Sequence, residues 1–178
     1  MNAIIPDPNE NPKLQGHKNP DRRGSWDSYF MKLAHMAATR ATCPQRAVGA
    51  VIVQDKRVRG TGYNGAPANT PSCLEEGCLL VEDGACTRTI HAELNALLDT
   101  DPLKRKGATL YTTHRPCFRC ANAIVNAGIK EVVYATDHKN MAMMIQLFDS
   151  AGVTHRRYDL SPEWKEMLLP PTEETQAS

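Results

Sequence analysis

Two short motifs that can converge on one metal ion constrain this chain more than any other feature. The first is His91-Ala92-Glu93, and the second, further along the chain, is Pro116-Cys117-Phe118-Arg119-Cys120. One histidine and two cysteines leave the fourth tetrahedral position of a zinc ion open, as in catalytic zinc sites. A water bound there can have a pKa of about 7 and act as hydroxide. The glutamate, two residues after the histidine, is then placed to move protons without binding the metal.

Neither motif carries this interpretation alone, because C-x-x-C also occurs as a redox pair and H-x-E is common by chance. Their combination and order favour a metal site. Pro116 suits the first turn of a helix, and two cysteines three residues apart share one helix face. A helix amino end also lowers thiol pKa and favours the thiolate that binds zinc. The sequence therefore predicts a catalytic zinc held by His91, Cys117 and Cys120, with Glu93 as the catalytic acid and base.

Composition narrows the class of protein. A chain of 178 residues suits one domain with a buried core, and 21 basic against 20 acidic residues give no electrostatic footprint for nucleic acid. No apolar run approaches the roughly 18 residues of a membrane span, and Met1 to Pro20 lacks the apolar block of a secretory signal. Six cysteines then argue for metal binding or catalysis over disulfides. We expect a cytoplasmic protein that binds neither nucleic acid nor membranes.

The chain is expected to form one domain over 25–168, with a proline-rich irregular arm at 1–24 and a flexible tail at 169–178. Ser25 can cap a first helix. An apolar stripe at helical spacing follows it, formed by Trp26, Tyr29, Phe30, Leu33 and Ala37.

Strand and helix patterns then alternate along the domain. Apolar runs predict strands at 48–53, 58–63, 109–113, 131–136 and 153–158. Helical patterns occupy 90–98, 117–127 and 141–150, and glycines at 128 and 152 are placed to end the last two. The first two strands form a hairpin, and the later alternation indicates parallel strands between helix layers. We expect a three-layer α/β/α fold around a mixed five-stranded sheet.

A long segment at 64–89, rich in glycine, proline, asparagine and cysteine, precedes the histidine motif. A loop of that length needs a function or a fastener. Cys73 and Cys78 have a four-residue spacer, which is within the range of structural zinc sites. With Cys43 and Cys86 they would complete a tetrahedral site of four thiolates, and the alternative is a set of scattered buried thiols.

Several segments together resemble the cytidine/deoxycytidylate deaminase superfamily, from about Trp26 to Arg157. They are Thr42-Cys43-Pro44 before Val48-Gly49-Ala50, Gly62-Tyr63-Asn64-Gly65-Ala66-Pro67, His91-Ala92-Glu93-Leu94-Asn95-Ala96, the Pro116 to Cys120 motif, Ala127-Gly128-Ile129-Lys130 and Ala151-Gly152-Val153. Members that act on deoxycytidylate (dCMP) are the most similar. The resemblance implies zinc-dependent hydrolysis of dCMP to dUMP and ammonia, which feeds dTMP synthesis. It further implies a homohexamer that is activated by dCTP with magnesium and inhibited by dTTP, and a second, structural zinc.

Other branches of the superfamily fit less well. Cytidine deaminases that act on free nucleosides usually have cysteine at the position of His91, and tRNA adenosine deaminases have a shorter segment before the motif. The competence-operon deaminase-like proteins share the long cysteine-bearing segment, so the sequence does not separate them. Deamination of another cytosine nucleotide or of a base in nucleic acid, and a non-catalytic zinc-stapled interaction protein, remain alternatives. An intact Glu93 argues against the last of these.

Substrate contacts are less well marked than the metal site. The resemblance implies that Asn64 contacts the sugar, although Asn-Gly also favours a turn by itself. Arg88 and Arg115 lie near the motifs, and arginine suits bidentate recognition of a phosphate. A solvated or structural arginine is an equally good interpretation of each.

Overall fold

The structure is a computed structural model, and it describes residues 25–82, 84, 86–137 and 142–158. The arm predicted for 1–24, the domain end at 168 and the tail at 169–178 lie outside the described residues. Both sequence motifs lie within the described residues, as does the long loop apart from positions 83 and 85.

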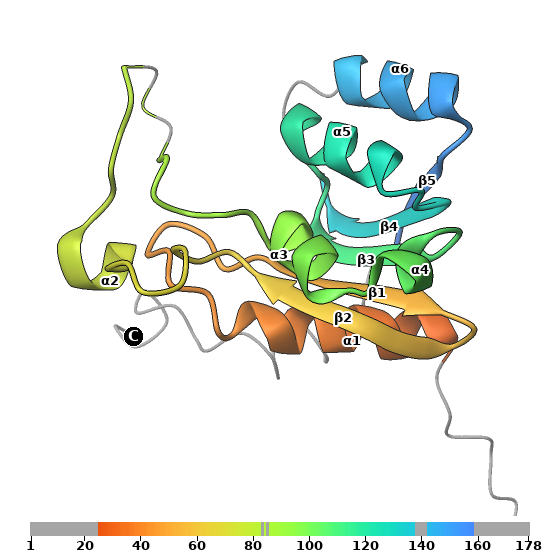
Figure 1. The fold of residues 1–178 in the computed structure, drawn as a ribbon, viewed down its shortest axis with the longest axis horizontal. Coiled ribbons are helices and arrows are strands. Elements are labelled where there is room, and N and C mark those ends of the chain that lie inside the picture. The colour runs from red at the N-terminus through yellow and green to blue at the C-terminus, as the bar shows by residue number, and fades with distance from the viewer. Residues whose placement is uncertain (1–24, 83, 85, 138–141, 159–178) are drawn as a thin grey trace, which may run out of the picture.

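Five strands form one mixed sheet at the centre of the molecule (Figure 1). Their order across the sheet is β2 (Arg57–Tyr63), β1 (Gly49–Gln54), β3 (Thr109–His114), β4 (Glu131–Thr136) and β5 (Thr154–Arg157). Strand β1 is antiparallel to both β2 and β3, whereas β3, β4 and β5 are parallel. The predicted hairpin and the mixed five-stranded sheet are therefore confirmed.

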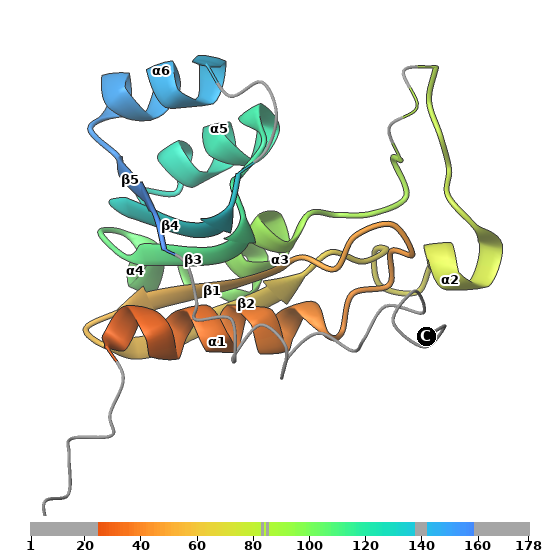
Figure 2. The same ribbon diagram turned by 180° about the vertical axis from the view of Figure 1, so that it is seen from behind.

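Helices cover both faces of this sheet and make three layers. Helix α1 (Trp26–Ala38) lies on one face, and α3 (Ala92–Asp99), α5 (Phe118–Asn126) and α6 (Ala142–Ala151) lie on the other (Figures 1 and 2). The predicted α/β/α fold is confirmed.

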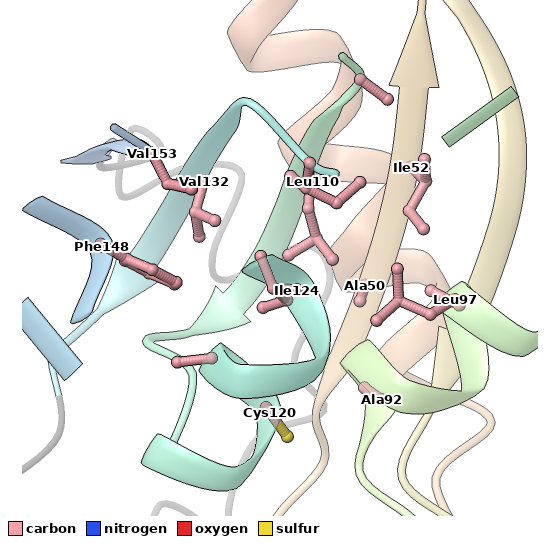
Figure 3. Close-up of a cluster of buried hydrophobic side chains, with 14 of the residues drawn as sticks. Ala50, Ile52, Ala92, Leu97, Leu110, Cys120, Ile124, Val132, Phe148 and Val153 are labelled. Carbon is pink, nitrogen blue, oxygen red and sulfur yellow. The ribbon is translucent and has the colours of Figure 1, made fainter. Parts of the chain in front are cut away.

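Side-chain alternation along β1 explains why the sheet is buried on both sides. Ala50 and Ile52 pack in the cluster under α3 and α5, which Figure 3 shows, while Val51 and Val53 pack against α1. All four are at most 6% exposed. Because successive side chains of a strand point to opposite faces, one short apolar run supplies both halves of the core.

Helix α1 begins where it was predicted to begin, because the Ser25 hydroxyl accepts a hydrogen bond from the Ser28 amide. Its buried face differs from the predicted stripe, since Trp26 and Tyr29 are about half exposed. The face that meets the sheet is formed by Phe30, Met31, Ala34 and Ala38. The backbone of α1 comes very close to β1 at Ala34 and Ala38, because a Cβ at Gly49 would stand only 2.0 Å from the Ala34 carbonyl oxygen.

The remaining differences from the predicted elements are small. Two short helices were not predicted, α2 (Cys73–Glu76) inside the long loop and α4 (Pro102–Arg105) after α3. Gly128 and Gly152 have φ values of 76° and 67° and end α5 and α6, as expected of glycine after a helix. Part of the long loop extends away from the body beyond α2 (Figure 1). Among the described residues, none of the helices has the length and apolar character needed to cross a membrane.

Candidate active site

The two sequence motifs meet at the amino ends of two neighbouring helices. His91 is the residue that caps α3, and Cys117 caps α5. Strand β3 leads directly into the cysteine motif, so this site lies at the carboxyl end of a parallel strand. Open α/β sheets commonly place their ligands at this edge. The segment between the two motifs therefore brings the start of α5 back beside the start of α3.

The three predicted metal ligands converge. The Nδ1 atom of His91 lies 3.5 Å from the Cys117 sulfur and 3.3 Å from the Cys120 sulfur. Zinc bonds of about 2.0–2.3 Å in a tetrahedron separate ligand atoms by roughly 3.5–3.8 Å. All three ligand atoms lie within 4.8 Å of one another. One nitrogen and two sulfurs at these distances fit a zinc ion that keeps a fourth position open.

The electrostatics of this group favour a bound cation. The pKa of Cys117 is lowered to about 3, chiefly by its hydrogen bond with Cys120 and then by His91. Conversely, the Cys120 thiol has a raised pKa because it shares that hydrogen bond and is buried. The pKa of His91 is raised, first of all by its hydrogen bond with Cys117. Negative charge therefore already gathers on one sulfur, and a coordinated metal deprotonates the second.

Glu93 lies in the first turn of α3 and is only 4% exposed. It is not one of the three convergent ligands, although its carboxyl group hydrogen-bonds with Cys120. Burial raises the pKa of this carboxyl group. An acid that is buried beside the metal group, and whose pKa is shifted towards neutrality, suits repeated proton transfer.

A cavity of about 360 Å³ opens onto this group. Its volume is within the range of small-molecule sites in proteins. The residues singled out from the sequence that line its wall are His91, Glu93, Cys117, Asn64, Arg115, Cys43 and Cys86.

Asn64 contributes to the wall and also to its support. Its side-chain oxygen accepts a hydrogen bond from the Val48 amide, and its nitrogen donates to the Arg46 carbonyl, both at 2.8 Å. These bonds fix the segment that enters β1. An amide has a second N–H and a second lone pair, so the predicted sugar contact is compatible with this structural role.

The two candidate arginines separate clearly. Arg88 donates to the Pro71 carbonyl at 3.3 Å and pairs with Glu76 at 3.2 Å, so it ties parts of the long loop together. Arg115, by contrast, lines the cavity. Within the described residues, the lining of the cavity includes Arg115 and leaves Arg88 out.

Three of the four remaining cysteines form a second cluster. The ligand atoms of Cys73, Cys78 and Cys86 lie within 4.8 Å of one another, and the sulfurs of the first and last are 3.7 Å apart. Burial is the main cause that raises the pKa of Cys73 to about 12. Cys43 lies outside this described group and lines the catalytic cavity, as Cys86 also does. The second cluster therefore borders the first site.

Several wall residues were missed by the sequence analysis. His114 stands at the end of β3, and a rule that polar residues gather at the carboxyl ends of parallel strands would have found it. Gln45, Arg46 and Thr89 come from loops, and no local signal marks them.

Comparison with known proteins decides the family. Residues 24–136 match the model described as "Cytidine and deoxycytidylate deaminase zinc-binding region". The chain belongs to this deaminase family. The ComE operon protein 2 of Bacillus subtilis is 47% identical over 140 residues, which cover 78% of this chain and 74% of that protein. The deoxycytidylate deaminase of Mycobacterium phage D29 is 47% identical over 63% of this chain and 95% of its own length.

Solved structures agree with the family assignment. The dCMP deaminase of cyanophage S-TIM5, in complex with dCMP and dUMP, superposes with a TM-score of 0.62. It is 27% identical, over 83% of this chain and 98% of that one. The predictions of a cytidine-deaminase-like fold, a zinc-binding deaminase domain and a hydrolytic deaminase are confirmed at the level of the family.

Proposed function

We propose that this deaminase hydrolyses dCMP to dUMP and ammonia. The observation that carries the proposal is the buried Glu93 next to the convergent His91, Cys117 and Cys120 at the wall of a cavity. The relatives named deoxycytidylate deaminases, and the related structure with dCMP and dUMP, support the choice of substrate.

The chain's own residues account for the proton movements. A zinc ion held by His91, Cys117 and Cys120 would supply a water acidic enough to attack at neutral pH. Glu93 removes a proton from that water and delivers it to the ring nitrogen of the cytosine. It then carries a proton to the exocyclic amine, which leaves as ammonia. The carboxylate has to stay off the metal because it transfers a proton twice.

Glu93→Gln tests this role. The variant should keep its zinc and its fold and lose at least ~100-fold in turnover, the low end of general acid–base contributions. Glu82→Gln, at an exposed position of the long loop, is the matched control and should keep full activity. Ammonia release, elemental analysis and thermal melting give the three readouts. Near-normal activity with zinc still bound would rule out the role given to Glu93.

Substrate choice is tested by comparing dCMP, dCTP, deoxycytidine and cytidine in the same assay. We expect dCMP to be preferred, with Asn64 at the sugar and an arginine at the phosphate. A charge-assisted contact to the phosphate contributes roughly 1.5–3 kcal/mol, so kcat/KM should exceed that of the nucleoside by about 10-fold or more. Equal efficiency on deoxycytidine would contradict the proposal.

We further propose a second, structural zinc on Cys73, Cys78 and Cys86, with Cys43 as the fourth ligand. The three clustered sulfurs support it, and Cys43 is near enough to Cys78 to influence its pKa. Elemental analysis should give two zinc ions per chain, falling to one in Cys73→Ser. The zinc content of Cys43→Ser shows whether Cys43 is the fourth ligand of this site. One zinc in the intact protein, with these thiols freely titratable, would contradict the idea.

Regulation is proposed on the family resemblance alone. A homohexamer, activation by dCTP with magnesium and inhibition by dTTP should appear as a hexameric mass and as opposite shifts of a sigmoidal rate curve. Hyperbolic kinetics that neither nucleotide changes would remove this part of the proposal.

A further inference from the structure

Arg115 occupies a distinctive position at the carboxyl edge of the sheet. It directly follows β3, and its amide donates to the Thr136 carbonyl at 2.8 Å, which fixes its backbone beside the end of β4. The residue lines the catalytic cavity, and its side chain is only 15% exposed. An arginine that is so largely buried at a cavity wall needs partners to hold it.

Two residues from β4 and its end supply those partners. The guanidinium lies 4.3 Å from the centre of the Tyr134 ring and donates a hydrogen bond to the Tyr134 hydroxyl. Its Nη1 atom pairs with the Asp137 carboxylate at 2.9 Å. Stacking on an aromatic face and a charged hydrogen bond together restrict the side chain strongly. Tyr134 is 4% exposed, so its ring is itself fixed by packing.

The Arg115 guanidinium keeps hydrogen-bond donors that these partners do not use. Asp137 also lies 3.8 Å from an Arg157 nitrogen, so one carboxylate faces two guanidinium groups. The Nε atom of Arg115 is buried and has no hydrogen-bond partner among the described residues. A guanidinium has five N–H donors, of which Tyr134 and Asp137 use two. Donor capacity of Arg115 therefore remains at the cavity wall.

We propose that Arg115 binds the 5′-phosphate of the substrate, and that Tyr134 and Asp137 are positioning residues that hold its guanidinium at the wall. This inference rests on the proposed deamination of a deoxynucleotide. Under this proposal, Arg115 determines the preference for nucleotide over nucleoside. Arg88 has a structural role, because it holds parts of the long loop together.

The first test compares dCMP with deoxycytidine for the wild type and for Arg115→Met. Loss of the phosphate contact should lower kcat/KM for dCMP by about 10–100-fold, mainly through KM, and leave deoxycytidine unchanged. The nucleoside serves as an internal control, because a misfolded fraction would lower both rates equally. Arg88→Met is the matched control, because Arg88 lies outside the cavity lining, and it should keep the preference for dCMP.

Equilibrium binding gives a readout that does not depend on turnover. Calorimetry compares the inactive Glu93→Gln variant with the double variant that also carries Arg115→Met. The double variant should bind dCMP more weakly and deoxycytidine equally well. If the wild type treats the two substrates alike, the proposed function fails and the inference fails with it. If the wild type prefers dCMP and Arg115→Met keeps that preference, only the inference is overturned.

Tyr134→Phe and Asp137→Asn test positioning. Tyr134→Phe keeps the ring but loses the hydroxyl, so KM for dCMP should rise about 3–10-fold while kcat is unchanged, the loss of one neutral hydrogen bond. In the Arg115→Met background the same change should have no further effect, and an additive effect would show that Tyr134 acts independently.

Asp137→Asn distinguishes two possible roles of the Asp137 carboxylate. If Asp137 positions the guanidinium, its loss weakens dCMP binding. If it only offsets charge, its loss leaves more positive charge at the wall and tightens binding, which would overturn the role proposed here.

Discussion

A methyl group added at Gly62 should displace the helix that carries half of the active site. Gly62 lies on β2 directly beneath α3, and a Cβ there would stand 2.2 Å from the Ala92 carbonyl oxygen and 2.3 Å from the Ala96 nitrogen. Both are backbone atoms, so the steric conflict cannot be relieved by the rotation of a side chain. Restoring an ordinary contact requires α3 to retreat by about 1 Å, because packed interiors leave no spare volume.

The magnitude of the effect depends on that shift. Overpacking of this kind costs about 1–3 kcal/mol of unfolding free energy. Ala92 stands between His91 and Glu93, so a retreat of α3 carries both away from the cysteines of α5. A misplacement of about 1 Å can lower catalytic efficiency by roughly 100-fold. Gly62→Ala should therefore lose both stability and activity.

Gly49→Ala is the matched control. Its Cβ would lie 2.0 Å from the Ala34 carbonyl of α1, so the steric conflict is similar, but α1 carries no ligand. Urea unfolding should show comparable losses of stability for the two variants, whereas ammonia release and zinc affinity should fall much further in Gly62→Ala. A fully active Gly62→Ala protein, or equal activity losses in the two variants, would refute the argument that close packing at Gly62 sets the position of α3.

Two further predictions concern stability. Arg156 lowers the pKa of Asp27 below its usual value through two hydrogen bonds, with a further one from the Tyr111 hydroxyl. This stabilisation is complete above about pH 4 and is lost as the pH falls through the folded-state pKa. Asp27→Asn should thus cost about 1–2 kcal/mol at neutral pH, since the pair is partly exposed, and urea titrations should show the gap to wild type closing under acid conditions. Phe148→Ala, at a fully buried position of α6 (Figure 3), should cost about 3–5 kcal/mol in the same assay while leaving the kcat of folded molecules unchanged.

The sequence alone predicted the five strands, the longer helices and the candidate ligands that converge in the structure, because their signals are local. Apolar alternation, glycines after helices and a serine cap each act over a few residues, which is why β4 has the predicted ends and α1 starts at its cap. Likewise, the chemistry of one histidine and two cysteines suits a zinc ion, and this preference can be read from the residue types alone.

Tertiary structure decided everything that depends on a partner distant in sequence. It left Trp26 and Tyr29 about half exposed, with their rings against Phe30, which packs on the sheet in their place. It also bound Arg88 to Glu76 and placed Arg115 against Tyr134, although proximity to the motifs had made the two arginines equivalent. The register of β3 against β4 places Arg115 beside Tyr134, because it fixes which side chains meet at the edge of the sheet. The two strands are too far apart in the sequence for a local pattern to reveal this contact.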